Sequence, residues 1–122
     1  MVQGLFAGNI PFIQIALGWG QAVQTPVFIL DTGFSGDLQV TPEIAQQLGL
    51  TVSGVTPAKI ADGSVIQTPT ALAIAAMEGA ASLVQVLIAQ SPPLAGISLL
   101  TKFHYKAIVD CKHRTVQLER VA

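Results

Sequence analysis

Apolar residues occur along the chain in short runs that are separated by turn-forming residues. Runs of roughly four to eight apolar residues between glycine- or proline-containing turns are typical of β-strands. Gly8-Asn9 lies between two such runs, residues 2–7 and 11–17, and predicts a hairpin. Gly18-Trp19-Gly20 predicts a second turn, which precedes a strand over residues 21–30. The first part of the chain is therefore predicted to be β-structure.

The later part of the chain repeats this pattern of short strands and tight turns. Residues 56–68 predict two strand arms around Asp62-Gly63, which is a strong hairpin-turn signal. Residues 71–76 and 83–89 predict another hairpin through Glu78-Gly79. The alanines of its first arm also fit a helix, but the short length of the arm favours a strand. Together with strands predicted over residues 38–40, 105–109 and 115–118, the pattern favours an all-β barrel or sandwich.

One helix has clear start and stop signals. Thr41 and Pro42 suit the N-cap and the first helical position. Gly49 suits the residue that follows the last turn, so this helix is predicted over residues 42–48. A second, shorter helix is expected within residues 96–103.

The composition favours association with another chain. A length of 122 residues is that of one domain, spanning residues 1–122, and is enough to bury a core without disulfides. Apolar residues make up 51% of the chain and charged residues 11%, against roughly 25% charged in average domains. So few charges leave apolar side chains on the surface, and an exposed apolar area usually marks an association surface.

Charge, hydropathy and cysteine content restrict the partners and the location. The net charge of −1 gives no overall field to attract nucleic acid. The longest apolar stretch, residues 71–89, is interrupted by polar residues, so no membrane association is expected. Cys111 is the single cysteine, which fits a reducing compartment and a cytoplasmic location. Cys111 and His113 have no second pair of ligands at zinc spacing, so neither a metal nor a cofactor is expected.

One carboxylate stands at the end of an apolar run. Residues 27–30 are apolar, and Asp31-Thr32-Gly33 follows them directly. A strand that delivers an ionisable group to a glycine-containing loop is a common way to build a site. Such a carboxylate needs hydrogen-bond partners, and Thr32 and Ser35 bring hydroxyls. The same residue types also form ordinary turns, so the triplet alone supports either a site or a turn.

The residues around Asp31 belong to a longer motif. The stretch FILDTGFSG, residues 28–36, resembles the active-site signature of aspartic proteases. The stretch LAGISLL, residues 94–100, is similar to the second motif of the retropepsin-like branch, although Ala95 stands where a larger apolar residue is common. This resemblance covers nearly the whole chain and implies a retropepsin-like acid protease barrel with one or two short helices. The pattern looks closest to small bacterial-type predicted aspartyl proteases.

The resemblance assigns roles to individual residues. Asp31 would be the catalytic carboxylate, and Thr32 would hydrogen-bond the partner's loop across a two-fold axis. The Gly33 N–H would support the carboxylate, and Ser35 would hydrogen-bond its outer oxygen. Phe34 stands where the family often has a smaller residue and would narrow the substrate site. A flap that closes over the substrate would carry four further residues at its tip, Ala61, Asp62, Gly63 and Ser64.

The reaction implied by the resemblance needs two carboxylates. One takes a proton from water and the other polarises the peptide carbonyl. The chain has a single Asp-Thr-Gly triplet, so the second carboxylate is expected from another copy in a homodimer. The expected activity is that of an aspartic endopeptidase acting on a peptide or protein substrate.

Two other functions stay open at this point. The same dimer could hold a peptide in its groove with little or no turnover, because a fold does not guarantee chemistry. A phosphotransfer enzyme also uses a strand-end aspartate, but it needs a second acidic residue two positions on, where this chain has Gly33. His104 and His113 have no nucleophile signature beside them and are assigned no role.

Overall fold

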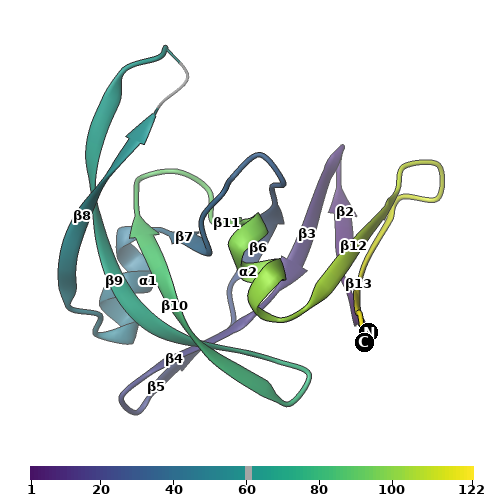
Figure 1. Cartoon of the computed structure of the whole chain (residues 1–122), viewed down its shortest axis with the longest axis horizontal. Helices are drawn as coiled ribbons and strands as arrows, with labels where there is room; N and C mark the ends of the chain where they lie inside the picture. Colours follow the sequence, from purple (N-terminus) through teal and green to yellow (C-terminus); the bar gives the residue numbers. More distant parts are fainter. Residues whose placement is uncertain (60–61) are drawn as a thin grey trace.

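A computed structural model of the chain describes residues 1–59 and 62–122. These residues form thirteen strands and two short helices, which confirms the all-β prediction. Ten strands belong to one sheet and three to a second. In Figure 1 the larger sheet is strongly curled. The hairpin of β8 (Val52–Lys59) and β9 (Val65–Met77) projects from one side, and β12 (Tyr105–Asp110) and β13 (Thr115–Arg120) lie on the other side beside the two termini.

The N-terminal hairpin turns where the sequence predicted, but both of its predicted runs are divided, residues 2–7 at Gly4 and residues 11–17 at Ile15. Strands β2 (Leu5–Ala7) and β3 (Ile10–Gln14) are antiparallel and meet at Gly8-Asn9, where Gly8 has a φ of +60°. Strand β1 (Val2–Gln3) precedes them and pairs with β13 in the three-stranded sheet. The beginning and the end of the described chain are therefore joined in one sheet.

The predicted single strand over residues 21–30 is wrong. The chain forms β4 (Ala16–Trp19), turns at Gly20 with a φ of +59°, and continues as two strands, β5 (Ala22–Gln24) and β6 (Val27–Leu30). The turn therefore follows Trp19, which pairs with Ala22 instead of lying in the turn. The strand breaks at residues 25–26 because β5 pairs with β4, whereas β6 pairs with β3 elsewhere in the sheet.

Strand β9 is longer than the sequence predicted. Two separate strands were expected here, but one strand of 13 residues serves both the β8–β9 hairpin and the following one. Pro69 does not end it, because its partner Val55 lies in β8, while β10 (Ala80–Ile88) pairs only as far as Thr70. A strand position with one neighbour tolerates the missing proline N–H. The β9–β10 turn lies at Glu78-Gly79, as predicted.

Both predicted helices are present. Helix α1 (Pro42–Leu48) begins after Thr41, whose hydroxyl oxygen accepts the Ile44 N–H at 3.2 Å, and it ends at Gly49 with a φ of +67°. Helix α2 (Ile97–Lys102) is the shorter second helix. No helix in the described part of the chain is long and apolar enough to cross a membrane.

A two-residue strand connects the two halves of the larger sheet. Strand β11 (Leu94–Ala95) lies between β6 and β7 (Leu38–Val40), parallel to the first and antiparallel to the second. Because α2 begins two residues after β11, this insertion holds α2 next to the chain that connects β6 to β7. That connection contains the Asp-Thr-Gly triplet.

The core is apolar and draws on both sheets and both helices. Alternating residues of the strands face it, as in β9, where Ala71, Ala73 and Ala75 are fully buried. The small alanines let the neighbouring strands carry larger side chains into the same space. The largest fully buried side chains include Phe28, Ile13, Ile15, Leu17, Leu38, Leu48, Leu99 and Leu118.

Candidate active site

Asp31 is held at the end of β6 by backbone contacts on both sides. Its N–H donates to the carbonyl oxygen of Ala95 in β11 at 3.0 Å, and its own carbonyl accepts the Phe34 N–H at 3.1 Å. Its carboxylate oxygen Oδ1 accepts the Gly33 N–H at 2.9 Å. The side chain is thereby oriented by main-chain groups of its own loop.

Helix α2 supports the loop that follows Asp31. The first N–H groups of a helix have no partner within the helix. Here Gly96 donates to the Asp37 carbonyl at 3.0 Å, Ile97 to Phe34 at 2.9 Å and Ser98 to Gly36 at 3.2 Å. A Cβ at Gly96 would overlap carbonyl oxygens of the loop, so only glycine allows this approach. The second motif of the sequence therefore packs against the first.

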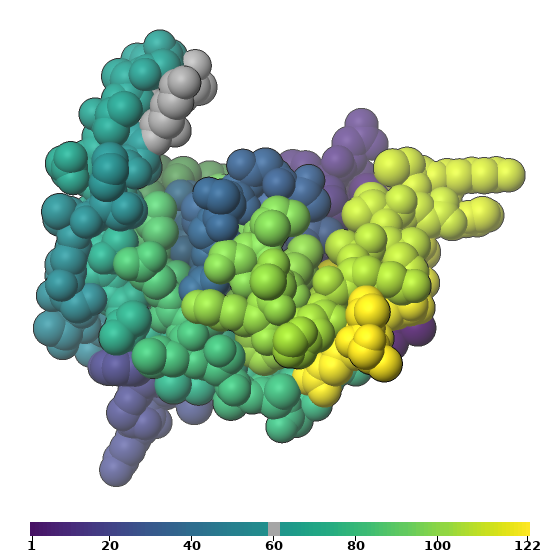
Figure 2. All heavy atoms as spheres, viewed as in Figure 1, coloured from purple at the N-terminus to yellow at the C-terminus, as the bar shows by residue number. Residues whose placement is uncertain are grey.

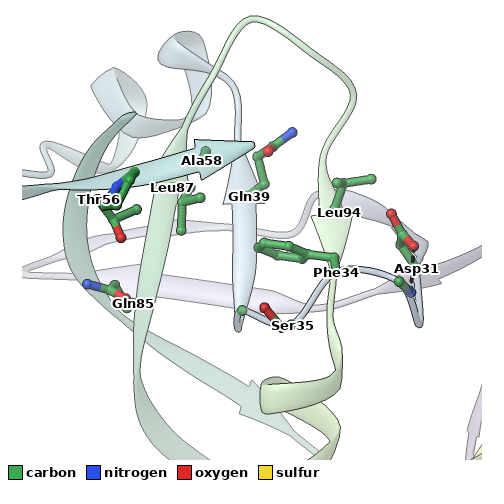
Figure 3. Close-up of a pocket in the computed structure, with 12 residues that line it drawn as sticks. Asp31, Phe34, Ser35, Gln39, Thr56, Ala58, Gln85, Leu87 and Leu94 are labelled. Carbon is green, nitrogen blue, oxygen red and sulfur yellow. Dashed lines mark hydrogen bonds between the residues drawn. The ribbon is translucent and has the colours of Figure 1, made fainter. Parts of the chain in front are cut away.

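A cleft of about 500 Å³ opens beside Asp31. Its base is the loop after β6, its far wall is β10 and the β8–β9 hairpin stands over it (Figure 3). Figure 2 shows that this hairpin stands away from the rest of the molecule, so that the cleft is open. Asp31 is the one ionisable residue among those that line the cleft within the described parts of the chain.

Four of the predicted site residues line this cleft: Asp31, Gly33, Phe34 and Ser35. Thr32 is exposed at the side of the loop and does not line it. In Figure 3 the Phe34 ring extends from the loop toward Gln39 and Leu87, so it occupies part of the floor. No hydrogen bond joins Ser35 to Asp31 among the residues described, and the role assigned to Ser35 stays a prediction.

The Phe34 ring has room because of two glycines. A Cβ at Gly36 would lie 2.6 Å from the ring atom Cζ, and a Cβ at Gly96 would lie 2.7 Å from Cδ2. The ring is therefore packed closely against backbone on two sides. This packing holds the ring in place on the floor of the cleft.

The predicted flap tip lies at the turn between β8 and β9. Gly63 has a φ of +88°, and Asp62 Oδ1 accepts the Ser64 hydroxyl at 2.6 Å and the Ser64 N–H at 2.8 Å. These two bonds hold the pKa of Asp62 below its usual value. Asp62, Gly63 and Ser64 do not line the cleft within this single chain. Ala61, the fourth predicted tip residue, lies outside the described residues.

Most residues of the cleft walls were not predicted from the sequence. Gln85 and Leu87 come from β10. A glutamine within this largely apolar strand was the one local sign that the strand borders a polar space. Gly36 and Leu94 lie within the two motifs without having been assigned to the cleft. The rest had no local signal, because their part in the cleft depends on how distant strands pair. The missed lining residues are Gly36, Gln39, Thr56, Pro57, Ala58, Gln85, Leu87 and Leu94.

Comparisons with known proteins identify the architecture. No family model matches the chain, and no curated protein matches it. Among solved structures, the chain is similar to a retropepsin-like aspartic protease from Rickettsia conorii, with a TM-score of 0.64 and 19% sequence identity. The match covers 100% of this chain and 90% of that protein. The chain therefore has the fold of the retropepsin-like aspartic proteases.

Proposed function

We propose that the chain is an aspartic endopeptidase whose active site is formed by the Asp31 carboxylates of two subunits. The observation that carries this proposal is the position of Asp31 in the cleft. It is the one ionisable lining residue among those described, and the Gly33 N–H orients its carboxylate. The similarity in fold to an aspartic protease supports the same chemistry.

The second carboxylate has to come from another copy of the chain. Peptide hydrolysis by this chemistry needs an acid and a base that face each other across one water molecule. A two-fold axis beside Asp31 would supply two identical groups from identical loops. The low content of charged residues, 11%, supports association of this kind. The single cysteine supports a reducing, cytoplasmic location for the dimer.

The proposed reaction begins with the two Asp31 carboxylates sharing one proton, because like charges at close range do not both ionise. The ionised carboxylate takes a proton from the water while the water oxygen bonds to the peptide carbonyl carbon. The protonated one gives its proton to the carbonyl oxygen. In the resulting diol, one hydroxyl returns a proton to a carboxylate and the other Asp31 protonates the nitrogen. The C–N bond then breaks and releases an acid and an amine.

The remaining predicted residues would bind and enclose the substrate. An extended peptide would lie between the loop after β6 and the β8–β9 hairpin, which is the usual way in which a strand-like ligand binds to sheet edges. Phe34 would set the width available next to the scissile bond. Asp62, Gly63 and Ser64, together with Ala61, would close over the peptide as a flap. The Thr32 hydroxyl would bond to the loop of the partner subunit, and the Ser35 hydroxyl would bond to the outer oxygen of the Asp31 carboxylate.

Replacement of Asp31 by asparagine tests the proposal. Asp31→Asn keeps the shape of the side chain and removes its acid–base chemistry, so peptide cleavage should fall by at least about a thousandfold while folding and dimer formation persist. Asp110→Asn, at the end of β12, is the matched control and should keep full activity. Cleavage should also rise with protein concentration as dimers form.

The outcomes separate the two functions that the cleft supports. A wild-type dimer that binds peptides in the cleft but does not cleave them would favour a binding module. Cleavage that survives in pure Asp31→Asn protein, or cleavage by a monomer, would contradict the proposed mechanism. Sedimentation of the same samples establishes which species is present.

A further inference from the structure

An ion pair between a buried carboxylate and a partly exposed lysine lies behind residues 31–37, the active-site loop. Asp37, the last residue before β7, is only 5% exposed. Its oxygen Oδ2 accepts the Lys102 ammonium at 2.6 Å and the Gln85 N–H at 2.9 Å. The Lys102 ammonium also donates to the Leu83 carbonyl at 3.3 Å. One carboxylate thereby connects the loop to the last turn of α2 and to the edge of β10.

Stability alone is a poor explanation for this pair. The buried Asp37 carboxylate loses its hydration, and solvent screens its attraction to the Lys102 side chain, which is 38% exposed. Burial raises the pKa of Asp37, but the Lys102 ammonium and the Gln85 N–H outweigh it, so that the pKa lies below its ordinary value. Oδ1 is buried and has no hydrogen-bond partner among the described residues. Asp37 is thus a charged group in a costly place.

The pair joins the active-site loop to α2 and to β10. The loop begins at Asp31, which is bonded to β11, and ends at Asp37. The N-terminal end of α2 binds the loop carbonyls, and Lys102 at the other end of α2 binds the Asp37 side chain. The backbone N–H of Gln85 binds Asp37, and Gln85 is also one of the residues that line the cleft. A shift of Asp37 would therefore move both the loop and the cleft wall.

We propose that Asp37 and Lys102 are positioning residues, whose ion pair fixes the loop that carries Asp31 against α2 and β10. The inference rests on the proposed peptidase function for its effect on turnover. Neither residue lines the cleft, so both act through the loop. A displacement of about 1 Å at a reacting group can lower the rate about a hundredfold. A directional ion pair can hold the loop in one position, whereas an apolar pair of similar size would not fix its position in the same way.

A set of variants separates positioning from stability. Lys102→Met leaves the Asp37 charge buried with a single donor and should destabilise the protein. The double variant Asp37→Asn, Lys102→Met removes that charge while the amide oxygen still accepts the Gln85 N–H, so much of the lost stability should return. Its kcat should nevertheless stay about tenfold below wild type, with KM changed by less than about twofold, because the link to α2 is missing. Lys102→Arg should preserve the link and most of kcat.

The matched control is Lys106→Met. Lys106 pairs with Glu119 at 3.4 Å on the surface of the smaller sheet, with 60% of its side chain exposed, and its loss should change neither stability nor kcat.

A second measurement does not depend on peptidase activity. The Asp31 N–H donates to Ala95, so its hydrogen-exchange rate reports how firmly the loop is held. In the double variant this exchange should accelerate about tenfold relative to wild type, while amides of α1 exchange as before. Unchanged Asp31 exchange in the double variant, or a kcat equal to wild type, would overturn the positioning role. If the wild type cleaves no peptide, the proposed peptidase function fails, and the exchange of Asp31 still decides the positioning role.

Discussion

A methyl group at Gly96 should disrupt the contact between α2 and the active-site loop. Gly96 has a φ of −111°, which any residue adopts, so the backbone conformation itself carries no penalty. The obstacle is space, because a Cβ would overlap the carbonyl oxygens of Gly36 and Phe34. Since these atoms belong to backbone, the variant Gly96→Ala can fold only if the loop moves away from the helix.

The expected cost follows from the contacts that this movement breaks. The N–H groups of Gly96, Ile97 and Ser98 donate to the loop at 3.0, 2.9 and 3.2 Å. Each such bond contributes about 1 kcal/mol net, and overpacking adds about 1–3 kcal/mol. With all three bonds broken, Gly96→Ala should therefore lower the free energy of unfolding by about 4–6 kcal/mol, a large part of the roughly 5–15 kcal/mol that stabilises a typical domain.

Urea unfolding, followed by the fluorescence of Trp19, measures this change. The control is Gly18→Ala in β4, where the nearest atom to a new Cβ is the Ala22 carbonyl oxygen at 3.6 Å, an ordinary contact. The control should stay within about 0.5 kcal/mol of wild type. If Gly96→Ala also stays within that range, the loop is not held tightly against α2, and the account of how Asp31 is supported is refuted.

Two further predictions concern the hairpin tip and a buried tyrosine. Gly63→Val, at a φ of +88°, should strain the hairpin tip by about 1–2 kcal/mol and lower turnover about tenfold. The control Gly79→Val, at a φ of +78° in the β9–β10 turn, should be strained to a similar degree and keep its turnover. Equal losses of turnover in the two variants would show that the tip is not a flap. Burial and the hydrogen bond to Glu78 at 2.7 Å raise the Tyr105 pKa to about 12. The phenol of the unfolded chain has a pKa near 10, so the free energy of unfolding should fall as the pH rises from about 10 to about 12. Urea unfolding at a series of pH values measures this fall. A Tyr105→Phe variant whose free energy of unfolding falls equally steeply with pH would contradict the prediction.

Local sequence signals were sufficient where the structure is set by neighbours along the chain. Helix α1 was predicted with its correct ends because Thr41 and Gly49 satisfy its terminal groups by themselves. The turns at Gly8 and Gly79 were predicted because their positive φ values favour glycine. The Asp-Thr-Gly triplet was also recognisable from the sequence, because its three residues are consecutive.

Long-range pairing accounts for the features that the sequence did not reveal. Strand β9 continues through Pro69 because only β8 pairs with it there, a fact that no local pattern contains. Gln39 and Gln85 line the same cleft because β7 pairs with β10. Asp37 had no visible role, because its partner Lys102 is 65 residues away. These residues became recognisable only once β11 and α2 were placed behind the loop.

The hydrogen bonds of the active-site loop bear on the proposed dimer. Carbonyls of Phe34, Gly36 and Asp37 are bound by α2. Thr32, in the same loop, is exposed, and its hydroxyl has no hydrogen bond among the described residues. In the proposed dimer this hydroxyl would be available to the loop of the second subunit, which has to come close for two carboxylates to share one water.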